Sequence, residues 1–168
     1  MIREIAEMIN IFGEQEFKMI VRFGKVIPKY WISKDGRLYS ENSGKLLKAI
    51  PSYYTKADGT KRLSSVRTDL TIPEGLFEDY SHQSKSEGTV TITLRTHRAV
   101  METWRPIDEY PPIPKEDWDR CPESAKQWIR DTAIVDHKDD DPTNNHVDNL
   151  QWVIPKDNNP HRKAHKHD

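Results

Sequence analysis

The chain has 168 residues, of which 35% are hydrophobic and 32% are charged, with a formal net charge of −1 and one cysteine, Cys121. This length allows one domain with its own core, while the single cysteine excludes an internal disulfide framework and a cysteine-rich zinc cluster. No apolar run approaches the roughly 18 residues of a membrane span, and the N-terminus does not look like a signal peptide, so we expect a soluble cytoplasmic protein without a membrane partner.

The charges are unevenly distributed along the chain. Residues 1–105 hold 17 Lys/Arg against 13 Asp/Glu, residues 106–141 hold 5 against 11, and residues 156–168 hold 4 against 2. A basic front and a basic tail are compatible with local phosphate binding, although an ordinary solvated surface shows the same unevenness. The charges alone do not decide between these alternatives.

The first 25 residues predict a helical segment. Ile2, Ile5, Met8, Ile9 and Phe12 recur at helical spacing before Gly13 interrupts the pattern. A second apolar set is interpreted as a continuation of this helix, and it consists of Phe17, Ile20 and Val21. A structural role, packed on the domain or on a second subunit, is favoured over a catalytic one.

Residues 26–105 predict a β-rich region that ends in a helix. Apolar residues at 30–32 and 38–39 flank a turn signal at 34–36, which indicates a hairpin, and further turn signals stand at 42–44 and 58–59. Residues 88–94 (GTVTITL) are β-branched in alternation and predict a strand. Residues 95–104 predict a helix, ended by Pro106.

Residues 106–133 predict a connector and a helix. Five prolines, at positions 106, 111, 112, 114 and 122, predict an extended segment without regular helix, anchored by Tyr110 and Trp118. Residues 122–133 then predict a helix with Ala125, Trp128 and Ile129 on one face.

The segment from residue 134 onwards carries the candidate chemistry. A short strand at 134–135 delivers Asp136 and His137 to its end, a polar loop follows at 138–145, and a second strand is predicted at 150–154. Pro155 suits the first turn of a helix. This ββα order places Asn149 just before the second strand and Asn158 one turn into the helix.

These residue types suit phosphodiester hydrolysis. A carboxylate and an amide oxygen can hold Mg²⁺ or Mn²⁺ while leaving positions for water and phosphate. A neutral imidazole can take the proton of the attacking water, and the metal ion offsets charge on the transition state.

The string DHKDDDPTNNHVDNLQWV, followed by PKDNN, resembles the HNH endonucleases of the homing and bacteriophage type over residues 134–159. The steps of twelve residues from His137 to Asn149 and of nine from Asn149 to Asn158 are typical of that family. The resemblance implies a ββα-metal (His-Me finger) motif in which Asp136 and Asn158 ligate one Mg²⁺ or Mn²⁺ ion and His137 is the general base. It also implies that Asn149 braces the loop and orients His137 by hydrogen bonding.

The resemblance extends more loosely upstream, and it implies that residues 26–105 are the DNA-recognition region. Residues 30–48 look like the NUMOD4-like β module that often precedes this nuclease type, and THRAVMETW at 96–104 resembles a helix of the family. The connector before Asp136 is longer than in many relatives, and we expect the C-terminal helix-turn-helix module of some homing enzymes to be absent.

Several polar residues have two interpretations. Asn144 and Asn145 are predicted to form turns rather than to bind metal, and Asp139, Asp140 and Asp141 to form a solvated loop rather than a second metal site. His146 is assigned to structure or a minor DNA contact, and His97 to a buried, hydrogen-bonded position. The histidines of residues 161–167 have two interpretations: they bind a metal ion, or they belong to the basic end of a helix that contacts phosphate. Their irregular spacing favours the second interpretation. The candidate DNA contacts are Lys34, Arg37, Lys45, Lys48, Arg95, Arg98, Arg162 and Lys163.

The sequence therefore predicts an α+β protein with an antiparallel β region upstream and a ββα-metal motif at residues 134–168. The predicted function is a site-specific or moderately specific endonuclease of double-stranded DNA, acting as a monomer or homodimer and leaving 5′-phosphate and 3′-hydroxyl ends. The alternatives are a catalytically silent DNA-binding protein on the same scaffold and a nuclease for RNA or for non-specific DNA.

Overall fold

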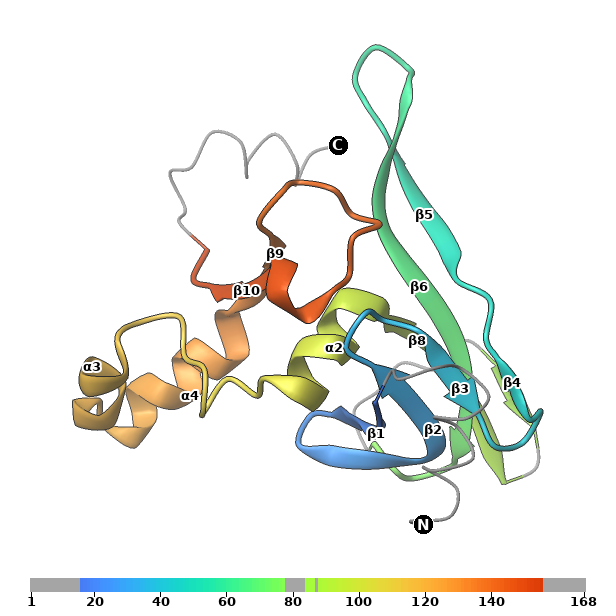
Figure 1. Cartoon of the computed structure of the whole chain (residues 1–168), viewed down its shortest axis with the longest axis horizontal. Helices are drawn as coiled ribbons and strands as arrows, with labels where there is room; N and C mark the ends of the chain where they lie inside the picture. The colour runs from blue at the N-terminus through green and yellow to red at the C-terminus, as the bar shows by residue number, and fades with distance from the viewer. Residues whose placement is uncertain (1–15, 78–83, 87, 156–168) are drawn as a thin grey trace.

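Three antiparallel β-sheets and three α-helices make up the part of the chain that the computed structural model describes, which is residues 16–77, 84–86 and 88–155 (Figure 1). The predicted α+β class with antiparallel strands is confirmed. Within these described ranges, no helix has the length and apolar character needed to cross a lipid bilayer.

The first sheet contains the predicted hairpin and has the strand order β1-β2-β3-β4. Its strands are β1 (Phe17–Arg22), β2 (Lys25–Ser33), β3 (Leu38–Ser40) and β4 (Lys45–Leu46). Trp31 of β2 pairs with Tyr39 of β3, so the chain reverses at residues 34–37, where the sequence carries its turn signal.

The prediction that residues 17–21 continue an N-terminal helix is wrong, because they form strand β1. Residues three apart share one face of a helix but lie on opposite faces of a strand. Here both faces of the strand are covered: Phe17 packs with Trp31, and Ile20 enters the main core. The predicted boundary at residue 25 falls inside the β1–β2 hairpin, where Arg22 pairs with Lys25. The earlier part of the predicted helix lies outside the described residues.

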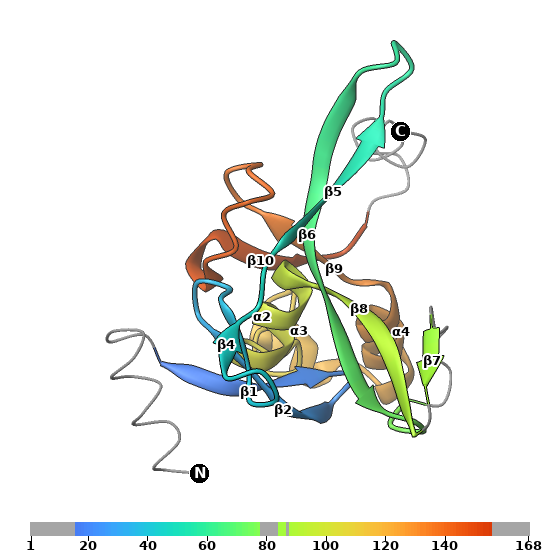
Figure 2. The ribbon, with the colours of Figure 1, turned by 90° about the vertical axis from the view of Figure 1, so that its right-hand side faces the viewer.

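The second sheet has the strand order β5-β6-β8-β7. Its strands are β5 (Ile50–Thr55), β6 (Lys61–Pro73), β7 (Ser84–Ser86) and β8 (Thr89–Arg95), and β8 confirms the strand predicted at residues 88–94. The outer halves of β5 and β6 extend away from the rest of the molecule (Figures 1 and 2). We call residues 53–63 the β-arm; the structure describes all of them, and none is buried.

Helix α2 (Thr96–Trp104) confirms the helix predicted after β8 and lies in the middle of the molecule (Figure 1). Its buried residues include Ala99, Val100 and Met101. They belong to one hydrophobic core that also takes in Ile20 of the first sheet and Leu150 of the last strand. The three sheets and α2 therefore share this core.

The connector contains a short helix, so the prediction of no regular helix between residues 106 and 122 is wrong. Helix α3 (Lys115–Arg120) starts directly after Pro114, and its residues include no proline to interrupt the hydrogen bonds. Trp118 is buried as predicted, whereas Tyr110 is half exposed, with the guanidinium of Arg105 over its ring.

Helix α4 (Glu123–Thr132) confirms the helix predicted at residues 122–133. Ile129 is buried, but Trp128 is 58% exposed, so the predicted common face of these two residues is wrong. Adjacent residues point about 100° apart around a helix, and only Ile129 faces the protein.

Strands β9 (Ile134–His137) and β10 (Leu150–Val153) form the third sheet and confirm the two strands predicted for the candidate site. Leu150 and Trp152 are buried, as expected of core residues. The 3-10 turn η1 (Val147–Asn149) leads directly into β10. The helix predicted to start at Pro155 would occupy residues 156–168, which lie outside the described residues.

Candidate active site

Asp136 and His137 lie side by side at the end of β9, where the sequence predicted them. In the β9–β10 ladder, Leu150 pairs with His137 and Gln151 with Asp136. The Nε2 atom of Gln151 donates a 3.0 Å hydrogen bond to Oδ2 of Asp136. Both side chains are half-buried, so the strand end presents a carboxylate and an imidazole to the surface.

The imidazole of His137 contacts the loop through Asn145. Nε2 of His137 lies 2.8 Å from Oδ1 of Asn145, whose side chain is only 6% exposed. The expected hydrogen bond from Asn149 to His137 is therefore replaced by one from His137 to Asn145. The sequence contains two adjacent asparagines at this point, and no local signal distinguishes the buried one from its exposed neighbour Asn144.

Asn149 braces the loop, as the family resemblance implied. Its Nδ2 atom donates to Oδ1 of Asp139 at 2.8 Å and to the carbonyl of Asn144 at 2.9 Å, while its Oδ1 accepts from the backbone N–H of Asp139 at 3.3 Å. Its backbone carbonyl accepts from the N–H of Lys138 at 2.8 Å. These bonds close the loop between β9 and β10 on itself.

The acidic side chains of the loop also hold its shape. The hydrogen bond from Asn144, followed by those from the Asp141 N–H and from Asn149, lowers the pKa of Asp139 to about 2. Asp141 accepts hydrogen bonds from the hydroxyl and the N–H of Thr143, and the first of these is the main reason why its pKa is lowered. These contacts fit the predicted solvated loop better than a second metal site.

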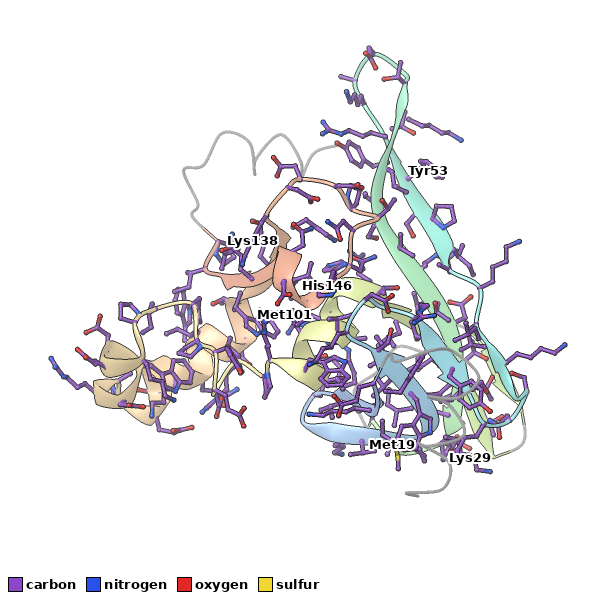
Figure 3. The ribbon with its side chains drawn as sticks, viewed as in Figure 1. Met19, Lys29, Tyr53, Met101, Lys138 and His146 are labelled. Carbon is purple, nitrogen blue, oxygen red and sulfur yellow. The ribbon has the colours of Figure 1, made fainter. Side chains whose placement is uncertain are left out.

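His146 and Lys138 lie on the same loop (Figure 3). Nδ1 of His146 accepts a 3.1 Å hydrogen bond from the N–H of Asp148 and so caps the turn η1, which supports the structural interpretation. Nζ of Lys138 donates to the carbonyl of Asp148 at 3.2 Å.

The loop is attached to the β2–β3 turn of the first sheet. The N–H of Val147 donates a 2.8 Å hydrogen bond to the carbonyl of Lys34. On the other side, Arg105 donates to the carbonyl of Val147 at 3.3 Å and forms a 2.6 Å ion pair with Asp148. Two segments distant in sequence therefore hold the turn η1, which ends at Asn149.

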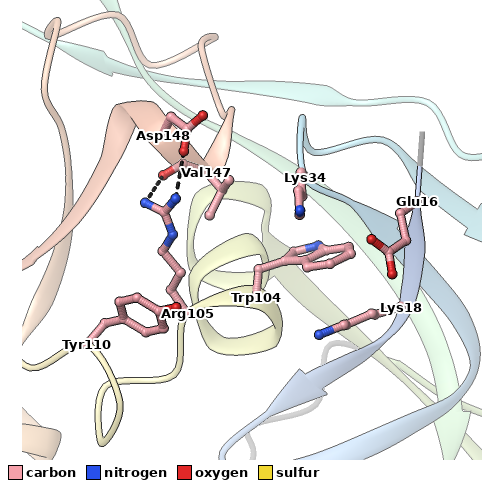
Figure 4. A pocket seen from close by; sticks show the side chains of 8 residues that line it. All are labelled: Glu16, Lys18, Lys34, Trp104, Arg105, Tyr110, Val147 and Asp148. Carbon is pink, nitrogen blue, oxygen red and sulfur yellow. Dashed lines mark hydrogen bonds and ion pairs between the residues drawn. The ribbon is translucent and has the colours of Figure 1, made fainter. Parts of the chain in front are cut away.

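A pocket of about 370 Å³ opens beside this attachment (Figure 4). The Nζ atoms of Lys18 and Lys34 lie 4.6 Å and 5.1 Å from the ring centre of Trp104. The residues that line the pocket are Glu16, Lys18, Lys34, Trp104, Arg105, Tyr110, Val147 and Asp148. They include none of Asp136, His137 and Asn149.

A metal ion at this strand end would have Asp136 as its carboxylate ligand. Asn158, the second predicted ligand, lies outside the described residues. Within the described ranges, no group of three or more His, Cys, Asp or Glu side chains is arranged to hold a metal ion. Besides Asp136, a hard cation such as Mg²⁺ would need further oxygen ligands, which an amide oxygen, phosphate and water can supply.

His97 of α2 packs against the candidate base. The ring centres of His97 and His137 are 5.1 Å apart. His97 is half-buried rather than fully buried, and this burial is the main reason why its pKa falls to about 3. The Nδ1 atom, however, is buried without a hydrogen-bond partner among the described residues, which the prediction of a hydrogen-bonded histidine did not anticipate.

The predicted DNA contacts differ in their surroundings. Lys34, Lys45, Lys48 and Arg95 are exposed, and Arg37 forms a 3.3 Å ion pair with Asp35. Arg98 instead lies over the ring of Trp152 and donates to the carbonyl of Ala133, which is a structural role. Arg162 and Lys163 lie outside the described residues.

The β-arm adds cations that the sequence analysis did not single out. Lys56, Lys61 and Arg62 lie at its outer end, where Asp58 is the only acidic residue. Tyr53, which is 59% exposed, projects from the arm at its inner end (Figure 3). In the sequence, the excess of basic residues around the turn at 58–59 was the signal that could have added these cations to the candidate DNA contacts.

Comparison with known proteins gives two similarities. Residues 107–159 match the sequence model of the HNH endonuclease family. Among solved structures, the chain is similar to the HNH homing endonuclease I-HmuI, from a study of its DNA binding and cleavage, with 24% identity and a TM-score of 0.44. The similarity covers 83% of this chain and 52% of that protein, so this chain spans about half of its length. No curated protein matches the chain.

Proposed function

We propose that this chain, whose residues 107–159 match the sequence model of the HNH endonuclease family, hydrolyses phosphodiester bonds of double-stranded DNA with one divalent metal ion. The observation that carries the proposal is the strand end of β9, where Asp136 and His137 are adjacent and Nε2 of His137 is engaged by Asn145. This leaves Nδ1 as the ring nitrogen that can accept a proton. A carboxylate beside such an imidazole provides a metal ligand and a general base.

In this mechanism, His137 takes a proton from water at Nδ1 while the water oxygen bonds to phosphorus. The bond from phosphorus to the 3′ oxygen breaks, the 3′ oxygen takes a proton from solvent, and the ends are a 5′ phosphate and a 3′ hydroxyl. A positioned general base contributes about 10²-fold to 10⁴-fold to the rate of such a step. Asn149 acts at a distance by keeping the loop closed.

Asp136 fits the proposed role of metal ligand. Its Oδ2 accepts from Gln151, and its half-buried carboxylate is a hard oxygen donor of the kind that Mg²⁺ and Mn²⁺ prefer. We assign Asn158 as the second protein ligand, on the resemblance of the motif alone. When bound, the ion would offset the negative charge that develops on the phosphate and on the leaving oxygen.

We assign DNA binding to the β-arm and to the exposed cations of the upstream sheets. A two-stranded ribbon fits the major groove of B-form DNA. Lysine and arginine side chains along the ribbon can neutralise the charge of nearby phosphates and so strengthen binding. Lys61 and Arg62 are exposed on the arm, and Lys45 and Lys48 are exposed in the segment that precedes β5. Such a ribbon favours a site-specific or moderately specific enzyme over a non-specific one.

The oligomeric state decides the product of this proposed enzyme. One ββα site cuts one strand at a time, so a monomer nicks its target and a homodimer can make a double-strand break. The ends of the cut DNA, mapped at nucleotide resolution, distinguish these two cases.

A plasmid nicking assay with Mg²⁺ or Mn²⁺ tests the proposal. We expect the wild type to convert supercoiled plasmid to the nicked or linear form and His137→Ala to lose at least about 10²-fold in rate. Asp136→Ala should lose metal binding, measured by calorimetry with Mn²⁺, while its circular dichroism spectrum stays that of the wild type.

Equal rates for wild type and His137→Ala would contradict the assignment of the base. Tight DNA binding without cleavage in any divalent metal would instead indicate the silent DNA-binding alternative. Cleavage of random duplexes or of RNA at the same rate as a selected site would indicate a non-specific nuclease.

A further inference from the structure

Asn145 is the loop residue that contacts the proposed general base. Its Oδ1 atom lies 2.8 Å from Nε2 of His137, and its side chain is buried. The adjacent Asn144 is exposed and donates its hydrogen bond to Asp139. Of these two asparagines, Asn145 is therefore the one placed to influence the chemistry of His137.

The direction of this hydrogen bond determines which nitrogen of His137 is free. A carboxamide oxygen only accepts, so the contact requires the proton of the neutral imidazole to be on Nε2. Nδ1 then carries the lone pair that a general base needs. The opposite tautomer would place the proton on Nδ1 and leave no acceptor there for the proton of water.

The position of Asn145 is set by the β2–β3 turn of the first sheet. Gly36 in this turn has φ +88°, and a Cβ atom on it would lie 3.1 Å from Cβ of Asn145 and 3.0 Å from Cγ2 of Thr96. Two residues after Asn145, the N–H of Val147 donates to the carbonyl of Lys34 in the same turn. The turn thus holds the backbone beside Asn145 and leaves room for its side chain.

We infer that Asn145 is a positioning residue for DNA cleavage, whose carboxamide keeps the proton of His137 on Nε2 and fixes the ring so that Nδ1 receives the proton of the attacking water. The inference rests on the proposed function, in which His137 is the general base. Asn149, by contrast, acts only on the loop, through Asp139 and Asn144.

Nuclear magnetic resonance of protein with ¹⁵N-labelled histidine tests the contact without substrate or metal. In the wild type we expect a slowly exchanging proton on Nε2 of His137, assigned by its loss in His137→Ala. Asn145→Leu keeps the size of the side chain but removes the acceptor, so this signal should disappear. Asn145→Asp keeps an acceptor and should retain the signal, as should the matched control Asn144→Leu.

Cleavage kinetics test the consequence of the contact for the reaction. We expect Asn145→Leu to lower kcat by about 10-fold to 100-fold, the usual effect of removing the partner that orients a functional histidine, with little change in KM. Asn145→Asp should recover a large part of this loss. Melting temperatures of both variants report whether the fold is intact.

A wild-type His137 with its proton on Nδ1, or an Asn145→Leu variant with unchanged kcat, would overturn the inference. If Asn145→Leu does not fold, the wild-type spectrum and Asn145→Asp still decide it. Failure of the proposed function would look different, because the wild type would then cleave no DNA while the Nε2 proton of His137 could still be observed.

Discussion

His97 and His137 lie ring against ring, with centres 5.1 Å apart and planes inclined by 55°. The contact joins helix α2 to the end of β9 and so connects the hydrophobic core to the proposed base. Burial, followed by the charges of His137 and Arg95, lowers the pKa of His97 to about 3. His97 is therefore neutral at pH 7.

Replacing His97 by Phe should flatten the dependence of stability on pH. The pKa of His97 is about 3 in the folded protein and close to 6.5 in the unfolded chain, so between these values only the unfolded state takes up the proton. Stability then falls as the pH falls, by roughly 2 kcal/mol between pH 7 and pH 5 from this group. Urea denaturation of both proteins at pH 7, 6 and 5 measures the difference. Parallel curves for the two proteins would contradict the burial of His97.

Gly36→Ala should be more destabilising than Gly59→Ala, although the two glycines have nearly the same backbone angle. Their φ values are +88° and +86°, so both substitutions cost about 1 kcal/mol or more of backbone strain. A Cβ on Gly59 meets nothing within 4 Å, whereas one on Gly36 meets Thr96 and Asn145 at 3.0 Å and 3.1 Å. We expect a further loss of about 1–3 kcal/mol at Gly36 from this overpacking, measured by chemical denaturation. Equal losses at the two positions would show that the close approach to Asn145 has no energetic effect.

Removing cations from the β-arm should lower the affinity for DNA and make this affinity less sensitive to the salt concentration. The test variant is Lys61→Gln combined with Arg62→Gln, and its matched control is Arg120→Gln, an exposed cation of α3 on the other side of the molecule (Figure 1). Each phosphate contact that is lost should lower the slope of log Kd against log salt concentration by about 1. Fluorescence anisotropy at several salt concentrations measures this slope. If the control loses as much affinity as the test variant, the arm is not the DNA-binding element.

Asn149→Ala should loosen the loop between β9 and β10. The variant loses two bonds donated by Nδ2 and one accepted by Oδ1, and we expect a loss of stability of about 1–3 kcal/mol. Asn42→Ala, in the exposed turn between β3 and β4, is the control and should change stability by no more than about 0.5 kcal/mol. Hydrogen exchange should show faster exchange of the Asp139 and Lys138 amides in Asn149→Ala. Unchanged exchange rates there would argue against the bracing role.

The sequence by itself determined the elements whose signals are local. Alternating β-branched residues predicted β8, Pro106 marked the end of α2, and the turn signal at residues 34–36 predicted the β2–β3 hairpin. The motif also placed Asp136 and His137 at a strand end, because both residues belong to one short local segment. The local pattern predicted a helix where the structure has β1. Both faces of this strand are buried, so its apolar residues recur at a spacing that is also typical of a helix.

Only the tertiary structure decided which groups surround His137. Asn145 is buried and Asn144 is exposed because the β2–β3 turn, more than one hundred residues earlier, packs against one of them. His97 reaches His137 because α2 and β9 share a core, and the same packing takes Arg98 out of the set of candidate DNA contacts. Such contacts form between segments that are distant along the chain, and a local pattern of residue types cannot predict which distant segments pack together.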